Sequence, residues 1–146
     1  MEIPVKIKRL SPDVRIPEYQ TEGSAAVDMR AHTEGPVTVL PGDTCLVPTG
    51  LAIECPPSVV ALIFPRSGLA IKKGITLSNC VGVIDSDYRG EIKIGITNHG
   101  REPFEILPGD RIAQMGFFPV FKASFEECDE LSDTERGSGG FGHTGV

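Results

Sequence analysis

The sequence has no long hydrophobic segment. None of its apolar runs approaches the roughly 20 residues that a membrane-spanning helix needs. The first ten residues, MEIPVKIKRL, mix charged and hydrophobic residues and lack the apolar core of a secretory signal. We therefore expect no membrane partner, and we expect the protein to be cytoplasmic or to occupy a comparable reducing compartment.

The sequence also lacks paired cysteines. Its four cysteines, Cys45, Cys55, Cys80 and Cys128, form no Cys-x-x-Cys pair, and no cluster of histidines lies near them. This spacing argues against a metal site built from thiolates and favours ordinary buried thiols.

Positive charge is scarce as well. Lysine and arginine number 14 against 20 aspartates and glutamates, which gives a net charge of −6. A general nucleic-acid-binding protein presents a basic face, so we expect no direct nucleic-acid binding. An anionic ligand must instead be held by a few local cations and backbone amides.

The secondary structure predicted from the sequence consists mainly of short strands. The 146 residues suit one domain, in which glycine (17) and proline (12) separate short apolar runs. In Val5–Lys8 and Glu91–Ile96 apolar residues alternate with polar residues or glycine, as half-buried strands require. Further strands are predicted at 37–40, 44–47, 51–54, 59–64, 104–107 and 112–118. Many short strands at this spacing predict an all-β sandwich or barrel.

One short helix is predicted after Pro65. Ser67 is a good N-cap residue, residues 69–73 can form one or two turns, and Gly74 can end the helix. The preceding Arg66, together with Ser67 and Gly68, suits a compact phosphate cradle. A simple helix cap is the alternative interpretation, since the segment does not match a P-loop.

The character of the chain changes after residue 125. Residues 126–135 are acidic and polar, and residues 136–145 contain five glycines, so we divide the chain into a core, 1–125, and an arm, 126–146. The arm cannot pack a core of its own and is expected to be mobile in isolation. A disordered end is one interpretation. The Arg, Phe, His and Thr among the glycines favour an arm that closes over a ligand.

Residues 79–90, NCVGVIDSDYRG, predict a β-hairpin with an acidic turn. Two aspartates in a turn are as readily turn formers as functional groups. Asp85 differs from Asp87 because it follows the apolar Val83 and Ile84, so we expect its carboxylate at the edge of a desolvated pocket. Such a position raises the pKa of a carboxyl group, which suits a general base.

Five segments together resemble the five motifs of the trimeric dUTPase family, from about residue 20 to the C-terminus. The segments are AAVDM at 25–29, PRSGLA at 65–70, NCVGVIDSDYRG at 79–90, GDRIAQM at 109–115 and RGSGGFGHTG at 136–145. The resemblance implies a distorted β-barrel or jelly-roll subunit, a homotrimer with active sites at the subunit interfaces, and Mg²⁺-dependent hydrolysis of dUTP to dUMP and pyrophosphate. This reaction limits uracil incorporation into DNA and supplies dUMP for dTMP synthesis.

The resemblance also implies a role for each motif residue. Asn79 and the backbone around Val83, Ile84 and Lys93 read the uracil base, and Tyr88 lies under the deoxyribose. Asp85 deprotonates the attacking water. Arg66, Ser67 and Gly68 of a neighbouring subunit hold the phosphates together with Gln114, and Asp28 reaches magnesium through water. In the arm, Phe141 stacks on uracil, Arg136 meets the γ-phosphate, and Gly142, His143 and Thr144 add close contacts.

Two other functions are compatible with this resemblance. A dCTP deaminase shares the fold, but that family carries a catalytic glutamate ten residues after the hairpin aspartate, where this chain has Gly95. A regulatory dUTPase-like module without catalysis is the second alternative. The presence of Asp85, Tyr88, Arg66 and Gln114 together argues against it.

Overall fold

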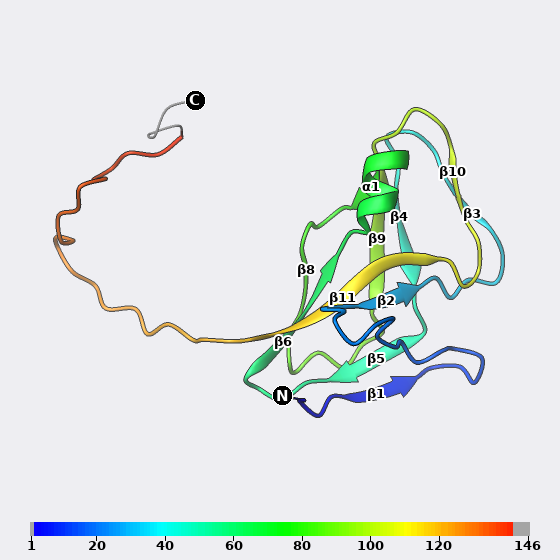
Figure 1. The fold of residues 1–146 in the computed structure, drawn as a ribbon, viewed down its shortest axis with the longest axis horizontal. Coiled ribbons are helices and arrows are strands. Elements are labelled where there is room, and N and C mark those ends of the chain that lie inside the picture. The colour runs from blue at the N-terminus through cyan, green and yellow to red at the C-terminus, as the bar shows by residue number, and fades with distance from the viewer. Residues whose placement is uncertain (1, 142–146) are drawn as a thin grey trace.

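The computed structural model describes residues 2–141, which form short antiparallel strands and one helix around a single core (Figure 1). One four-stranded sheet contains β2 (Val27–Arg30), β11 (Arg111–Pro119), β6 (Val59–Phe64) and β8 (Gly82–Ile84), in that order. A three-stranded sheet contains β4 (Thr44–Pro48), β9 (Lys93–Asn98) and β7 (Ile75–Leu77). Two strand pairs complete the barrel: β1 (Lys6–Arg9) with β5 (Leu51–Glu54), and β10 (Phe104–Ile106) with β3 (Val37–Val39). The predicted all-β fold is confirmed.

Alternating burial explains why most strands were predictable. In β6 and β9 every second residue is buried, so the hydrophobic pattern of period two is visible in the sequence. The side chains that point inward form one core. Its largest members are at most 1% exposed: Met29, Ile75, Ile92, Ile96, Ile106 and Met115.

The strands β2 and β7 were not predicted. Three consecutive residues of β2, Val27, Asp28 and Met29, are buried, so the strand shows no alternation and contains a buried carboxylate. β7 has only three residues and follows the helix directly.

The helix α1 spans Ser67–Lys73, but the predicted cap is wrong. Arg66, in an extended conformation, is the N-cap residue, and it makes no side-chain capping bond. Gly74 ends the helix as predicted, with φ 69° and its N–H donating to the carbonyl oxygen of Ala70. Within residues 2–141 no helix is long and apolar enough to cross a membrane.

The prediction of a hairpin at 79–90 is also wrong. β8 pairs with β6, whereas β9 pairs with β4 and β7, so the two strands flanking the acidic turn belong to different sheets. Locally the sequence is that of a hairpin, because both flanking segments have strand character. The turn that carries Asp85 therefore joins two sheets.

The cysteines are less buried than expected. All four are free thiols, and only Cys55 is fully buried; Cys45 is half-buried, and Cys80 and Cys128 are exposed. Burial raises the pKa of the Cys55 and Cys45 thiols, so neither is a reactive thiolate.

The chain leaves the barrel at the end of β11. The N–H of Val120 still donates to the carbonyl oxygen of Ser58 at 2.9 Å. Beyond it, Phe121, Phe125 and Leu131 are at least 87% exposed, and the chain runs outward, away from the barrel (Figure 1). This segment contributes little to the core.

Candidate active site

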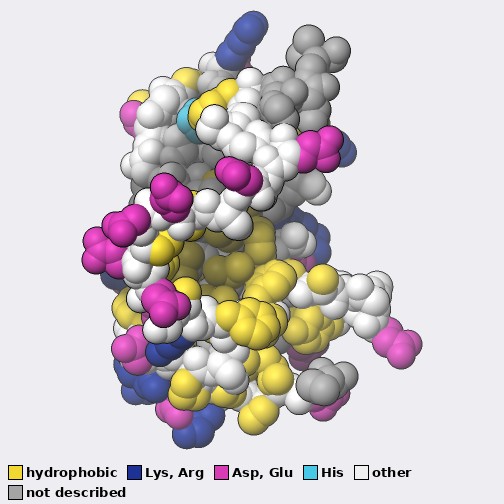
Figure 2. Space-filling view, turned by 90° about the vertical axis from the view of Figure 1, so that its left-hand side faces the viewer, with side chains coloured by type: hydrophobic (Ala, Val, Ile, Leu, Met, Phe, Trp, Pro, Cys, Tyr) yellow, Lys and Arg dark blue, Asp and Glu magenta, His cyan; other side chains and the backbone are white. Residues whose placement is uncertain are grey.

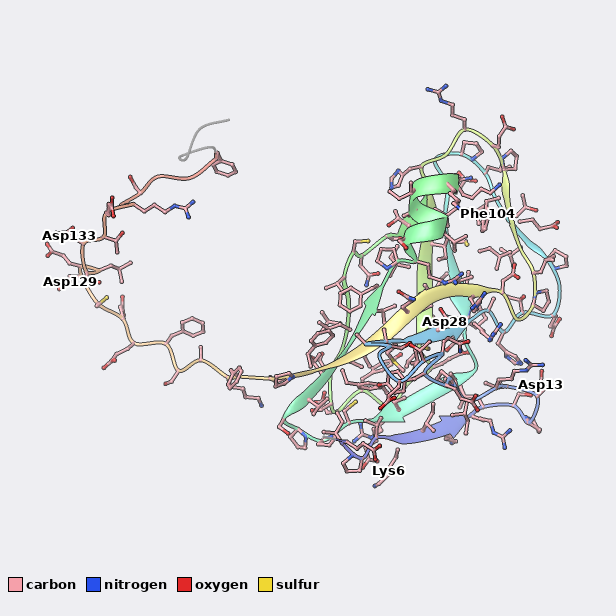
Figure 3. The ribbon with its side chains drawn as sticks, in the orientation of Figure 1. Lys6, Asp13, Asp28, Phe104, Asp129 and Asp133 are labelled. Atoms are coloured by element: carbon pink, nitrogen blue, oxygen red, sulfur yellow. The ribbon has the colours of Figure 1, made fainter. Side chains whose placement is uncertain are left out.

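A buried carboxylate holds two arginines together at one end of the four-stranded sheet. Asp28 on β2 has an 8% exposed side chain, and its Oδ1 lies 3.2 Å from Nε of Arg66 while its Oδ2 lies 3.3 Å from a terminal nitrogen of Arg111. Arg66 also donates to the carbonyl oxygen of Arg111 at 3.1 Å. Asp28 thus fixes the position of Arg66, and Figure 3 shows it just below the ribbon of β11.

The contact between Asp28 and Arg66 is ionic and poorly aligned as a hydrogen bond. Oδ1 of Asp28 and Nε of Arg66 are both buried, and neither has a hydrogen-bond partner among the described residues. The carboxylate oxygen therefore has no aligned hydrogen-bond donor and keeps an unused acceptor site.

The remaining phosphate-binding candidates surround Arg66. Gln114 on β11 is the register partner of both Asp28 on β2 and Phe64 on β6, which places it beside the strand end that leads to Arg66. Ser67 and Gly68 are exposed, and a Cβ at Gly68 would meet nothing within 4 Å. The structure therefore gathers Asp28, Arg66, Ser67, Gly68 and Gln114 into one group, which we call the arginine cradle.

Asp85 and Tyr88 lie in the turn after β8. The N–H of Tyr88 donates to the carbonyl oxygen of Asp85 at 3.1 Å, and Arg89 donates to the carbonyl oxygen of Ser86 at 2.7 Å. Asp85 is exposed, so this chain alone does not provide the desolvated pocket expected for it. A ligand or another chain must cover the carboxylate to desolvate it.

The far side of this turn is fastened to the loop between β4 and β5. The N–H of Gly50 donates to Oε1 of Glu91 at 2.8 Å, the hydroxyl of Thr49 donates to the carbonyl oxygen of Ile92 at 2.6 Å, and the N–H of Ile92 donates to the carbonyl oxygen of Leu51 at 2.8 Å. These bonds fix the backbone just after Tyr88.

Asn79 and Lys93 line a cavity of about 440 Å³ on the three-stranded sheet. Two of its lining residues, Ser78 and Thr44, are linked through Thr97 by hydroxyl hydrogen bonds of 2.9 Å (Ser78 to Thr97) and 2.8 Å (Thr97 to Thr44). Val83 is 56% exposed and Ile84 half-buried. The candidates for base recognition thus flank the turn that carries Asp85.

Neither Asp85 nor Tyr88 lines a larger cavity, of about 970 Å³. It is lined by residues 12–18, by Asp28 and by His32 among others. The ring of His32 contacts Asp13 at 3.1 Å, and hydrogen bonds from Ser11 and His32 lower the pKa of the Asp13 carboxyl. These contacts tie the N-terminal segment to the barrel.

The arginine cradle and Asp85 lie at opposite ends of β6. Ile84 pairs with Ala61 near the start of β6, whereas Arg66 follows the end of that strand at Phe64. At about 3.3 Å per residue, Asp85 and Arg66 are separated by roughly 15 to 20 Å along the strand. One chain therefore cannot bring both groups to the same phosphorus atom.

Residues 126–141, the described part of the arm, make no contact with either group within one chain. Arg136 donates to the carbonyl oxygen of Gly139 at 2.8 Å, and Phe141 is fully exposed. Asp129 and Asp133 mark the outward course of this part of the arm in Figure 3. Gly142, His143 and Thr144 lie outside the described residues.

Three residues that support the candidate site were not predicted from the sequence. Arg111 lies in the segment 109–115, and only the fold shows that it pairs with Asp28. Thr49 and Glu91 support the acidic turn through hydrogen bonds between residues that are 43 and 41 positions apart in the sequence. No local sequence pattern predicts contacts of that range.

Fold and site together define an all-β barrel protein with a cavity lined by Asn79 and Lys93, an exposed carboxylate and a separate arginine cradle. The family model of the dUTPases matches residues 13–145. The chain belongs to the dUTPase family.

Curated relatives match over nearly the whole chain. The deoxyuridine 5'-triphosphate nucleotidohydrolase of Shigella flexneri serotype 5b is 51% identical over 146 residues, which cover 97% of each chain. The protein of the same name from Desulfitobacterium hafniense (strain Y51) is 52% identical over 147 residues, which cover 99% of this chain and 97% of the relative.

Solved structures share the fold. The dUTPase of Staphylococcus bacteriophage 80alpha, solved with dUpNHpp, superposes with a TM-score of 0.90 at 26% identity and covers 98% of this chain and 99% of its own. A mutant dUTPase from phage phi11 of S. aureus, described with a structural Mg(II) ion, superposes with a TM-score of 0.79 at 21% identity, over 88% of this chain and 98% of its own. The latter likeness concerns the fold alone.

Proposed function

We propose that this protein hydrolyses dUTP to dUMP and pyrophosphate. The observation that carries the proposal is the pairing of two half-sites: a cavity lined by Asn79 and Lys93, which flank the turn of Asp85 in the sequence, and an arginine cradle at the other end of β6. Relatives at 51 and 52% identity are named deoxyuridine 5'-triphosphate nucleotidohydrolases, and a structural neighbour was solved with dUpNHpp.

The protein acts as a homotrimer in this proposal. Because Asp85 and Arg66 are too far apart within one chain, the cradle that serves a given Asp85 belongs to a neighbouring chain. Figure 2 shows hydrophobic side chains lining a hollow on the face at the left of Figure 1. Exposed apolar residues such as Val83 and Phe118 supply surface of the kind that subunit interfaces bury.

Hydrolysis uses Asp85 as the general base. The carboxylate accepts a proton from a water molecule as the water oxygen attacks the α-phosphorus. The bond between the α-phosphorus and the bridging oxygen breaks, and pyrophosphate leaves with its negative charge facing cations. Arg66, Ser67 and Gly68 of the neighbouring chain, together with Gln114, hold the phosphates and stabilise the developing charge.

Recognition of the nucleoside uses the elements around the turn. Asn79 and the backbone at Val83, Ile84 and Lys93 read the edge of uracil, and a rigid backbone rejects the 5-methyl group of thymine sterically. The ring of Tyr88 lies under the sugar and leaves no room for a 2′-hydroxyl group. This contact discriminates dUTP from UTP.

The described residues suit a magnesium ion that the protein contacts through water and not through a direct bond. Within residues 2–141 no group of three or more histidines, cysteines or carboxylates is placed to hold a metal, whereas Oδ1 of Asp28 has an unused acceptor site. Asp28 would therefore accept a hydrogen bond from a water of the ion, as suits a cation that keeps several waters. When bound by the triphosphate, Mg²⁺ would offset the negative charge that develops on pyrophosphate.

The arm, residues 126–146, closes the site in this proposal. Phe141 stacks on uracil and Arg136 pairs with the γ-phosphate, while Gly142, His143 and Thr144 add contacts. Because residues 121–141 run outward from the barrel after β11 ends at Pro119, the arm can reach another chain of the trimer. Closure excludes bulk water from the reacting atoms.

A deaminase of the same fold is disfavoured by the space at Gly95. A Cβ at this position would lie 3.0 Å from Oγ of Ser78, so a glutamate there requires Ser78 to move. We further propose that the enzyme works in the cytoplasm, where its four free thiols persist.

A pyrophosphate-release assay with magnesium tests this function. We expect rapid release from dUTP and release at least about a hundredfold slower, as kcat/KM, from UTP, dCTP and TTP. The comparison uses one enzyme preparation and equal nucleotide concentrations. Comparable rates with UTP and dUTP would contradict the role of Tyr88, and ammonia release from dCTP would establish a deaminase instead.

A further inference from the structure

The ring of Tyr88 is held against its own turn. Its hydroxyl donates to the carbonyl oxygen of Glu91 at 2.9 Å, three residues further along the chain. A Cβ built on Gly90, which the ring covers, would lie 2.6 Å from Cζ and 3.0 Å from Cε2 of Tyr88, and closer still to the hydroxyl oxygen. The ring therefore occupies the space that any side chain at position 90 would need.

Gly90 is required here for space and not for an unusual backbone conformation. Five glycines among the described residues have positive φ, and Gly90 is not one of them. Alanine is therefore compatible with the backbone at this position. The three atoms nearest to such a Cβ all belong to the side chain of Tyr88, which can move.

The backbone beneath the ring cannot yield instead. Glu91 and Ile92 are fastened to the loop at 49–51 by three hydrogen bonds of 2.6 to 2.8 Å, and Ile92 is 1% exposed. Tyr88, by contrast, is 44% exposed and has solvent on its outer side. A side chain added at Gly90 thus displaces the ring outward and breaks its hydrogen bond to Glu91.

We propose that Gly90 is a specificity-determining residue, whose missing side chain lets the ring of Tyr88 lie where it excludes a 2′-hydroxyl group. The inference rests on the proposed function, because it takes Tyr88 as the group that contacts the sugar. Gly90 itself touches no reacting atom. It acts by setting the position of Tyr88, so its effect should fall on the choice between ribonucleotide and deoxyribonucleotide.

The test is a double-mutant cycle on the full chain with Gly90→Ala, Tyr88→Ala and the double variant, measuring kcat/KM for dUTP and UTP. We expect Gly90→Ala to raise the UTP-to-dUTP ratio about tenfold or more, and to leave the ratio unchanged when Tyr88 is already alanine. Gly23→Ala is the matched control, since Gly23 is exposed with nothing within 4 Å of a Cβ. It should behave as wild type.

Each outcome decides the proposal. An unchanged ratio in Gly90→Ala beside a raised ratio in Tyr88→Ala overturns the role of Gly90 and leaves the proposed function standing. An unchanged UTP-to-dUTP ratio in Tyr88→Ala shows that Tyr88 does not exclude the 2′-hydroxyl group, and this overturns the role of Gly90 as well. Absence of dUTP hydrolysis by the wild type refutes the proposed function itself.

The proposal stays testable if Gly90→Ala fails to fold. Folding of the double variant then shows that the ring is the obstacle, and Tyr88→Phe, which loses the bond to Glu91, must raise the ratio. Failure of both to fold places the obstacle in the backbone and overturns the proposal.

Discussion

Asp85→Asn is expected to bind dUTP with near-normal affinity and to hydrolyse it about 10² to 10⁴ times more slowly, the usual contribution of a general base. The amide has the size of the carboxylate but does not accept a proton at neutral pH. Because Asp85 is exposed and lies in a turn, the substitution removes no core contact. Stability should therefore stay within a few tenths of a kcal/mol of wild type.

The matched control for Asp85→Asn is Asp87→Asn in the same turn. Both carboxylates are exposed and two residues apart, so a general effect of negative charge on the turn would appear in both variants. Pyrophosphate release under single-turnover conditions, together with calorimetric titration with dUTP and Mg²⁺, separates chemistry from binding. Near-normal turnover by Asp85→Asn, or equal losses in the two variants, would remove Asp85 as the base.

Truncation after Glu135 is expected to leave a folded, assembled protein whose kcat/KM for dUTP falls at least about a hundredfold. The deletion removes Arg136, Phe141 and the rest of the glycine-rich segment, none of which packs on the barrel among the described residues. The melting temperature should therefore be unchanged. Activity falls because the open site admits water and holds the triphosphate less well.

Two measurements accompany the truncation. Thermal unfolding and size-exclusion chromatography report the fold and the assembly, and initial rates over a range of dUTP concentrations separate KM from kcat. Asp129→Asn in the full-length chain is the control for altering the arm without removing its end, because Asp129 points into solvent (Figure 3). Wild-type kinetics from the truncated chain would show that residues 136–146 do not close the site.

Most of the fold was predictable because burial alternates along the strands. β5 (Leu51–Glu54) and β6 (Val59–Phe64) have the predicted bounds, and six others shift by one or two residues. β2 could not be found by this criterion because its buried Asp28 interrupts the hydrophobic pattern. β8 pairs with β6 and not with β9. This pairing is set by tertiary packing, and no local sequence pattern predicts it.

The residues that we propose for the site come from the sequence, but their geometry does not. Family motifs select Arg66, Asp85 and Gln114, yet the register of β6 alone shows how far Arg66 lies from Asp85. Similarly, Asp28 was predicted only as a partner of magnesium waters, and the fold adds its ion pairs with Arg66 and Arg111. The separation of Arg66 from Asp85 and the ion pairs of Asp28 both depend on contacts between residues that are distant in the sequence. Local sequence patterns therefore cannot predict them.

The central claim is that catalysis requires Asp85 of one chain and the arginine cradle of another. The most direct test co-expresses Asp85→Asn chains with Arg66→Gln chains, each inactive alone, and measures pyrophosphate release from dUTP by the purified mixed trimers. Random assembly gives about a quarter of the sites one intact half from each chain, so we predict about a quarter of wild-type activity. Mixing Asp85→Asn with the Asp85→Asn/Arg66→Gln double variant should restore nothing. Absence of activity in the first mixture, with assembly verified, would contradict the shared site.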